Sequence, residues 1–170
     1  MLSTDISDTA LQQLATETAQ ALKAREWRLV TAESCTGGWV AKILTDIVGS
    51  SAWFERGFVT YTNISKTEML GVDSKIIDNH GAVSELTVRE MARGALQHSH
   101  AHISLAITGI AGPGGGSDTK PVGLVWFAWA TRDEEVSCAE HVFAGDREAV
   151  RRQAVATALQ GVNSRLATSS

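Results

Sequence analysis

Two nearly continuous apolar runs constrain the fold of this chain more than any other feature. They cover residues 103–108 and 122–131, and neither alternates apolar with polar side chains as a strand with one wet face does. Such strands are typical of a sheet covered by helices on both faces. Because some connections are too short for a helical crossover, antiparallel pairs are expected beside parallel ones. The sequence therefore predicts an α/β fold: a single three-layer α/β/α domain over residues 1–170 with a mixed sheet.

Amphipathic segments supply the helices of this prediction. Apolar residues recur at helical spacing over 8–23, over 36–47, after Ser84 and after Asp146. Shorter helical pieces are expected over 64–70 and 74–79. Further strands are predicted over 28–32, in a segment that ends near Asn63, and over 136–143.

Composition excludes several classes of function. The net charge of −4 gives no electrostatic case for binding nucleic acid or an anionic membrane, and no run is long enough to cross a bilayer. Two cysteines, Cys35 and Cys138, are too few for a disulfide framework. No signal peptide opens the chain, so a cytoplasmic protein is expected. A homodimer is expected from base rates alone.

The turn around Ser34 has the character of a nucleophile site. Thr31-Ala32-Glu33-Ser34-Cys35-Thr36-Gly37-Gly38 joins a predicted strand to a predicted helix, where free N–H groups and the helix dipole favour negative charge. Gly37 and Gly38 carry no side chains to block a ligand. Two other interpretations stay open: a plain turn with Thr36 as N-cap, and Cys35 as the nucleophile instead of Ser34.

A serine nucleophile needs a base, and no histidine is well placed to serve. His98, His100 and His102 lie between a helix and a strand, and nothing supplies further metal ligands at suitable spacing. Lys66 is then the candidate base, provided that burial lowers its pKa. The competing interpretation is an ordinary exposed lysine.

Two more segments can bind an anionic or carbonyl group. The loop 108–117 is rich in glycine, and Gly109, Gly112 and Gly114 can expose backbone N–H groups, although it matches neither a P-loop nor a dinucleotide fingerprint. Arg147 and Arg151 lie four residues apart at the start of the last helix, where they suit a phosphate. A flexible connection and local ion pairing are the respective alternatives.

Taken together, these segments resemble one known family. Its hallmarks match residues 32–38, 57–61 with Asn63 and Lys66, 81–84, 108–115, 120–123 and 145–147. This is the pattern of the CinA C-terminal domain family, whose stand-alone members include nicotinamide-nucleotide amidohydrolases. The resemblance covers nearly the whole chain.

The resemblance implies hydrolysis of the carboxamide of nicotinamide mononucleotide to nicotinic acid mononucleotide and ammonia, in NAD recycling. Ser34 would be the nucleophile and Lys66 the base, with Tyr61 and Thr108 completing the polar network around the amide. Backbone N–H groups near Thr36 and Gly37 would stabilise the oxyanion. No metal or cofactor is expected. The small-molecule substrate would be the partner, anchored through its phosphate by the glycine-rich loop or by Arg147 and Arg151.

Two other functions remain possible on sequence grounds. The chain could be a non-catalytic, nucleotide-binding or regulatory paralogue of the same fold, or an amidase for a different small carboxamide. Binding without ammonia release would identify the first, and a panel of substrates would identify the second.

Overall fold

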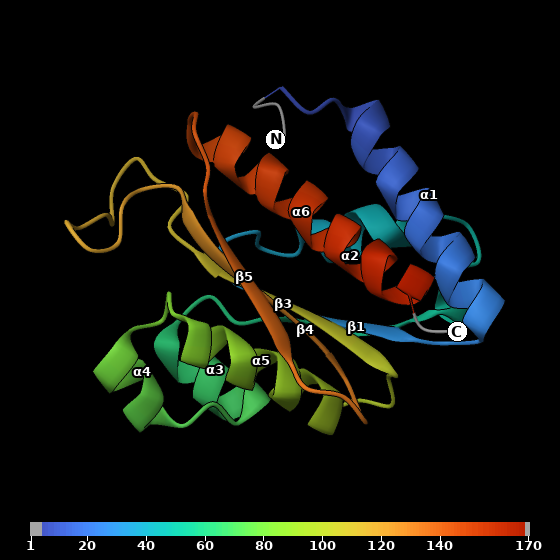
Figure 1. Ribbon diagram of the computed structural model, residues 1–170, viewed down its shortest axis with the longest axis horizontal. Helices are drawn as coiled ribbons and strands as arrows, with labels where there is room; N and C mark the ends of the chain where they lie inside the picture. The colour runs from blue at the N-terminus through green and yellow to red at the C-terminus, as the bar shows by residue number, and fades with distance from the viewer. Residues whose placement is uncertain (1–4, 169–170) are drawn as a thin grey trace.

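The computed structural model describes residues 5–168 and places a five-stranded sheet between two layers of helices (Figure 1). Helices α1, α2 and α6 cover one face, and α3, α4 and α5 cover the other. The elements in chain order are α1 (Asp8–Arg25), β1 (Leu29–Glu33), α2 (Trp39–Thr45), the 3-10 helix η1 (Ser50–Ala52), β2 (Phe54–Val59), α3 (Asn63–Leu70), α4 (Ser74–His80), α5 (Glu85–Gln97), β3 (Ile103–Gly109), β4 (Leu124–Thr131), β5 (Ser137–Val142) and α6 (Arg147–Thr168).

The sheet is mixed, in the order β2-β1-β3-β4-β5. Strand β1 runs parallel to both β2 and β3, whereas β4 is antiparallel to β3 and to β5. The predicted three-layer α/β/α fold with a mixed sheet is confirmed.

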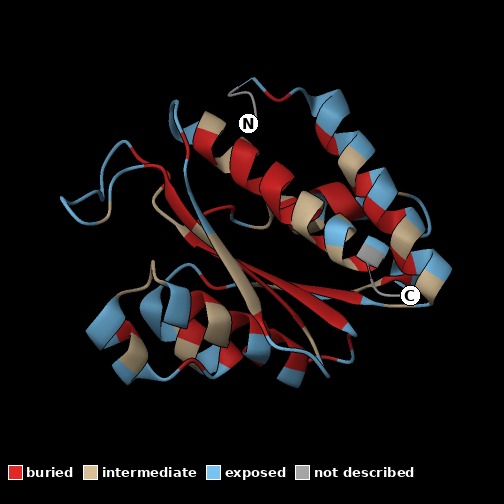
Figure 2. Cartoon of the chain, in the orientation of Figure 1, coloured by how far each residue is buried: buried red, intermediate tan, exposed pale blue. Residues whose placement is uncertain are grey.

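The central strands contribute side chains to two apolar cores, because successive side chains of a strand point to opposite faces. On β3, Ile103, Leu105 and Ile107 belong to the core under α1 and α6. Ala106, on the other face, joins the core under α5, as does Ala128 of β4. Figure 2 shows β3 and β4 buried along most of their length, with exposed residues on the outer sides of the helices. The two long apolar runs therefore form strands that contribute side chains to both cores.

The carboxyl ends of three parallel strands meet at one edge of the sheet. Glu33 at the end of β1 pairs in register with Val59 at the end of β2 and with Ile107 near the end of β3. Strand β5 also ends at this edge, because Val142 pairs with Leu124 at the start of β4. The segments that follow β1, β2, β3 and β5 therefore leave the sheet side by side, which is where ligand sites form in open α/β sheets.

Two predicted boundaries were wrong at this edge. The helix expected over 36–47 spans only Trp39–Thr45, because Gly37 and Gly38 have positive φ angles of 60° and 98° and turn the chain before the helix begins. The strand expected to end near Asn63 ends at Val59. Thr62 already caps α3 there, with its hydroxyl accepting the Ser65 N–H at 3.2 Å.

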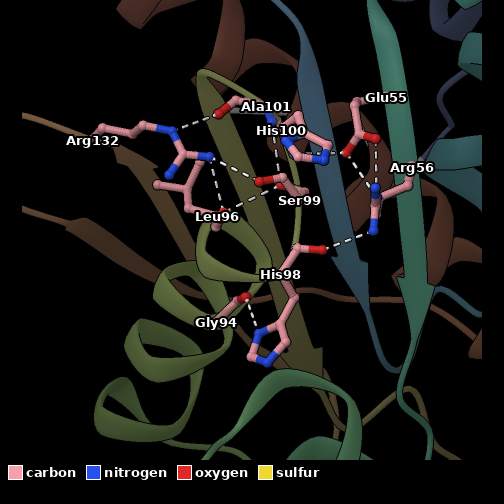
Figure 3. A network of polar contacts seen from close by, with 9 residues as sticks. All are labelled: Glu55, Arg56, Gly94, Leu96, His98, Ser99, His100, Ala101 and Arg132. Carbon is pink, nitrogen blue, oxygen red and sulfur yellow. Dashed lines mark hydrogen bonds and ion pairs between the residues drawn. The ribbon is translucent and has the colours of Figure 1, made fainter.

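A polar network at the carboxyl end of α5 includes two of the clustered histidines, His98 and His100 (Figure 3). His98 Nδ1 lies 2.8 Å from the carbonyl oxygen of Gly94, and the His100 N–H donates to Glu55. Arg132 donates to the carbonyl of Leu96 in the last turn of α5 and to those of Ser99 and Ala101 just after it. In the part of the chain that the structure describes, no group of His, Cys, Asp and Glu could hold a metal ion. Within residues 5–168, no helix is long and apolar enough to span a membrane.

Candidate active site

Ser34 and Lys66 form a hydrogen-bonded pair at this edge of the sheet. Ser34 follows β1 directly, and Lys66 lies on α3, one helical turn after the Thr62 cap. Lys66 Nζ is 3.0 Å from Ser34 Oγ and donates to the carbonyl oxygen of Thr60 at 2.7 Å. A serine and a lysine that lie 32 positions apart are thus held within reach of proton transfer.

The ammonium group of Lys66 is almost completely buried, with 1% of the residue exposed. No carboxylate among residues 5–168 forms an ion pair with it. Burial without a counter-ion disfavours the charged form and lowers the pKa of Lys66 from 10.5 to about 8. About a tenth of Lys66 is therefore the neutral amine at pH 7, and this form can accept a proton.

Cys35, the rival nucleophile, has the opposite chemistry. Its side chain is buried in the core under α1 and α6, and burial raises the pKa of the thiol to about 12. Since the thiolate is the reactive form of cysteine, this thiol is inert near neutral pH. The geometry favours Ser34.

Glu33 explains how α2 begins without a side-chain cap of its own. Its buried carboxylate accepts the N–H groups of Val40 at 2.9 Å and Ala41 at 3.1 Å, and the Thr36 hydroxyl at 2.6 Å. The N-cap residue Gly38 has no side chain to do this. Glu33 thus ties the end of β1 to the start of α2 across the Ser34 turn, and Thr36 donates to it.

A cleft of about 260 Å³ opens over the serine and the lysine. Its wall contains most of the predicted site residues: Ser34, Tyr61, Lys66, Thr108, Gly109, Gly112, Gly114 and Arg147. It does not contain Thr36, Gly37, Gly38 or Arg151. Asn63, Ala82 and Val83 also line the cleft; the family pattern includes all three, but the sequence analysis assigned them no role.

The hydroxyl groups around the cleft have defined partners. Thr108 Oγ1 donates to the carbonyl oxygen of Ala82 at 2.8 Å, so its lone pairs can accept a hydrogen bond from a ligand. The Tyr61 hydroxyl accepts from Arg147 Nη2 at 2.9 Å, and Arg147 Nη1 donates to Gly112 at 2.8 Å. Arg147 therefore joins the glycine-rich loop to the segment after β2, and further guanidinium N–H groups remain for a ligand.

Arg151 points to the back of the Ser34 turn. Its Nε donates to the carbonyl oxygen of Cys35 at 3.0 Å, and its Nη2 donates to that of Thr36 at 3.2 Å. The Gly37 N–H donates to the carbonyl oxygen of Ser34 at 3.0 Å, so it is engaged, contrary to the expectation that it would bind an oxyanion. Among the described residues, the N–H groups of Cys35 and Thr36 donate to no backbone carbonyl.

Sequence reasoning missed the contacts made by the main chain and by residues far along the chain. The Thr60 carbonyl that holds Lys66 carries no signal in its side chain. The Ala82 carbonyl that orients Thr108 lies in the segment 81–84, which the family pattern includes without a role. That hallmark was the one signal that could have placed the α4–α5 loop in the site.

Comparisons with known proteins identify the family of this chain. The nicotinamide-nucleotide amidohydrolase PncC of Escherichia coli K12 is 59% identical over 155 residues, which cover 91% of this chain and 94% of that protein. PncC of Pseudomonas putida is 49% identical, covering 88% of this chain and 92% of that protein. The crystal structure of the competence/damage inducible protein CihA from Agrobacterium tumefaciens has a TM-score of 0.90 at 45% identity, covering 93% and 96% of the two chains. A model of the CinA C-terminal domain matches residues 11–166, and the chain belongs to this family.

Proposed function

We propose that this protein is a nicotinamide-nucleotide amidohydrolase, which converts nicotinamide mononucleotide to nicotinic acid mononucleotide and ammonia with Ser34 as nucleophile. The activity is supported by the high identity to proteins named PncC over nearly their full length. The observation that carries the mechanism is the 3.0 Å contact between Ser34 Oγ and a buried lysine with a pKa of about 8.

In the first half-reaction, neutral Lys66 takes the hydroxyl proton as Ser34 Oγ attacks the carboxamide carbon. The cationic pyridinium ring withdraws electrons from this carbonyl, so a modest nucleophile can attack it. The N–H groups of Cys35 and Thr36 lie in the turn that holds the nucleophile and stabilise the oxyanion. Lys66 then returns its proton to the amide nitrogen, the C–N bond breaks, and ammonia leaves.

In the second half-reaction, water hydrolyses the acyl-enzyme. Lys66 removes a proton from the water, which attacks the ester carbon, and the proton passes to Ser34 Oγ as the ester bond breaks. Thr108 accepts a hydrogen bond from the carboxamide NH₂ group through its free lone pairs. Tyr61 forms the wall of the cleft beside the amide and is held by Arg147.

The phosphate of the substrate is assigned to Arg147 and to the N–H groups of the glycine-rich loop, which share the cleft wall. Arg151 is the weaker candidate for this role, since two of its donors already bind backbone carbonyls behind the turn. Gly109, Gly112 and Gly114 contribute through the main chain alone.

The cellular setting is also part of the proposal. The enzyme acts in NAD recycling in the cytoplasm, where Cys35 and Cys138 stay reduced, and both are free thiols here. It needs no metal or cofactor, since a serine, a lysine and backbone donors supply the chemistry. Base rates support a homodimer.

The test is ammonia release from nicotinamide mononucleotide by the wild type, Ser34→Ala and Cys35→Ala. Loss of turnover in Ser34→Ala alone, with full activity in Cys35→Ala, is expected. A wild type that binds the mononucleotide without releasing ammonia would instead identify a non-catalytic paralogue. Activity on other small carboxamides but not on the mononucleotide would refute the substrate assignment.

A further inference from the structure

The Ser34 turn is held from behind by a side chain from the other end of the chain. Arg151 of α6 spans two successive carbonyl groups of the turn: Nε donates to Cys35 and Nη2 to Thr36. Among residues 5–168, no carboxylate forms an ion pair with the Arg151 guanidinium, and its hydrogen bonds go to the backbone of the turn. A planar guanidinium that binds two acceptors at once fixes their orientation better than a single flexible ammonium group could.

The local structure is adapted to this contact. A Cβ atom at Gly37 would lie 3.3 Å from Arg151 Nη2, and the positive φ of 60° at Gly37 also disfavours any side chain. Trp39 lies beside the guanidinium, with Arg151 Cζ 5.7 Å from its ring centroid. Glycine at 37 and the aromatic ring at 39 therefore leave a place for Arg151 behind the nucleophile.

The contact determines where the opposite side of each peptide group points. In a planar trans peptide the N–H and the C=O point in opposite directions, and the cis peptide of this structure lies elsewhere, at Gly112-Pro113. Because Arg151 draws the Cys35 carbonyl toward α6, the Thr36 N–H of the same peptide points away from α6. The Gly37 N–H holds the Ser34 carbonyl in the same way and so orients the Cys35 N–H.

Together with that of Gly38, these are the N–H groups of residues 34–38 that donate to no backbone carbonyl in the described part of the chain. Cys35 contributes to the cleft wall. A positive group that hydrogen-bonds a carbonyl also polarises its peptide and strengthens the N–H on the far side as a donor.

We propose that Arg151 is a positioning residue that aims and polarises the Cys35–Thr36 peptide as an oxyanion donor for the Ser34 reaction. The inference rests on the proposed amidohydrolase function. It gives Arg151 a role in stabilising the transition state rather than in binding the substrate phosphate.

This role predicts a specific kinetic signature for Arg151→Met. Removing an oxyanion donor outright lowers kcat by roughly 100- to 1,000-fold. Here the donor remains but is less well oriented, so a decrease in kcat of about 10- to 100-fold is expected, with KM for nicotinamide mononucleotide within about twofold. Arg151→Lys, which keeps the charge and one donor, should recover part of the loss.

Arg152→Met is the matched control. Arg152 is the next residue of α6 and also stacks on Trp39, with Cζ 5.1 Å from the ring centroid. Its hydrogen bonds go to Ile6, Asp8 and Glu148 and not to the turn. Arg152→Met should therefore leave kcat unchanged, even if it lowers the melting temperature.

A second readout separates this role from simple loss of structure. Pyridine-3-boronic acid forms a tetrahedral anionic adduct with a serine hydroxyl and so mimics the oxyanion intermediate. Its inhibition constant should rise about 10- to 100-fold in Arg151→Met, in parallel with the loss in kcat, and should not change in Arg152→Met. Binding of the mononucleotide to Ser34→Ala should be the same with and without Arg151→Met.

The outcomes distinguish a failure of this inference from a failure of the proposed function. An active wild type whose kcat and boronate affinity are unaffected by Arg151→Met would refute the inference alone. A rise in KM with unchanged kcat would also refute it, in favour of a phosphate anchor. A wild type that neither releases ammonia nor binds the boronic acid would refute the proposed function, and the inference with it.

Discussion

Replacing Lys66 by methionine should abolish turnover and yet make the protein more stable. A pKa lowered from 10.5 to about 8 means that holding the protonated amine in this site costs about 3 kcal/mol. The substitution also removes the hydrogen bonds to Ser34 and Thr60, which together are worth about 2 kcal/mol. The free energy of unfolding should therefore rise by about 1 kcal/mol at pH 7, which is roughly 2–4 °C in Tm for a chain of this size.

The dependence on pH tests the cause of this gain. The wild type bears the full cost below pH 8, where Lys66 is protonated in both the folded and the unfolded state. Between about pH 8 and 10.5 the unfolded chain binds more protons, so the stability of the wild type rises with pH and the advantage of Lys66→Met shrinks. The Tm of the wild type and of Lys66→Met is measured from pH 6 to 10. The control is Lys75→Met, a substitution of an exposed lysine, whose free energy of unfolding should stay within about 0.5 kcal/mol of the wild type. A variant that is less stable than the wild type at pH 7, or a gain that does not change with pH, would refute the reasoning.

Two further predictions concern catalysis. Because the base must be neutral, kcat/KM for nicotinamide mononucleotide should rise tenfold per pH unit below pH 8 and level off above about 8; a flat profile from pH 6 upward would exclude Lys66 as the base. Arg147→Gln should raise KM for the mononucleotide by about 10- to 100-fold, the effect of losing a charged hydrogen bond. It should leave KM for the phosphate-free nicotinamide riboside unchanged, and an equal rise for both would place the phosphate elsewhere.

The sequence predicted the fold and the edge of the sheet that holds the site for a physical reason. Residues 103–108 and most of 122–131 are too apolar to face water, so helices had to cover both faces. Once β1, β2 and β3 are parallel neighbours, the segments that follow them must leave at one edge, which places Ser34 near Tyr61 and Thr108. Apolar runs, and the polar residues that directly follow them, are patterns of side chains close together in the sequence, so they can be recognised without a structure.

The contacts that shape the site chemically could not be predicted in the same way. Lys66 is buried and lacks a counter-ion because of how α3 packs, and its sequence neighbours do not reveal this. Its second partner is a main-chain carbonyl, which every residue has. Arg151 reaches the Ser34 turn from α6, 116 positions beyond Cys35, and local spacing suggested a phosphate site instead.

The motif alone does not say whether Ser34 or the adjacent Cys35 is the nucleophile, and the packing of the two side chains favours Ser34. Ser34 and Cys35 share one turn, and both have the right chemistry in principle. Gly109 on β3 makes room for the thiol: a Cβ there would lie 3.1 Å from Cys35 Sγ and 2.7 Å from Val125. The absence of a side chain on the neighbouring strand thus lets Cys35 pack inward, where burial suppresses the thiolate. Ser34 is left beside the buried amine of Lys66, which can take its proton. The glycine predicted to bind substrate therefore also helps to select the nucleophile, by providing space for the residue that does not react.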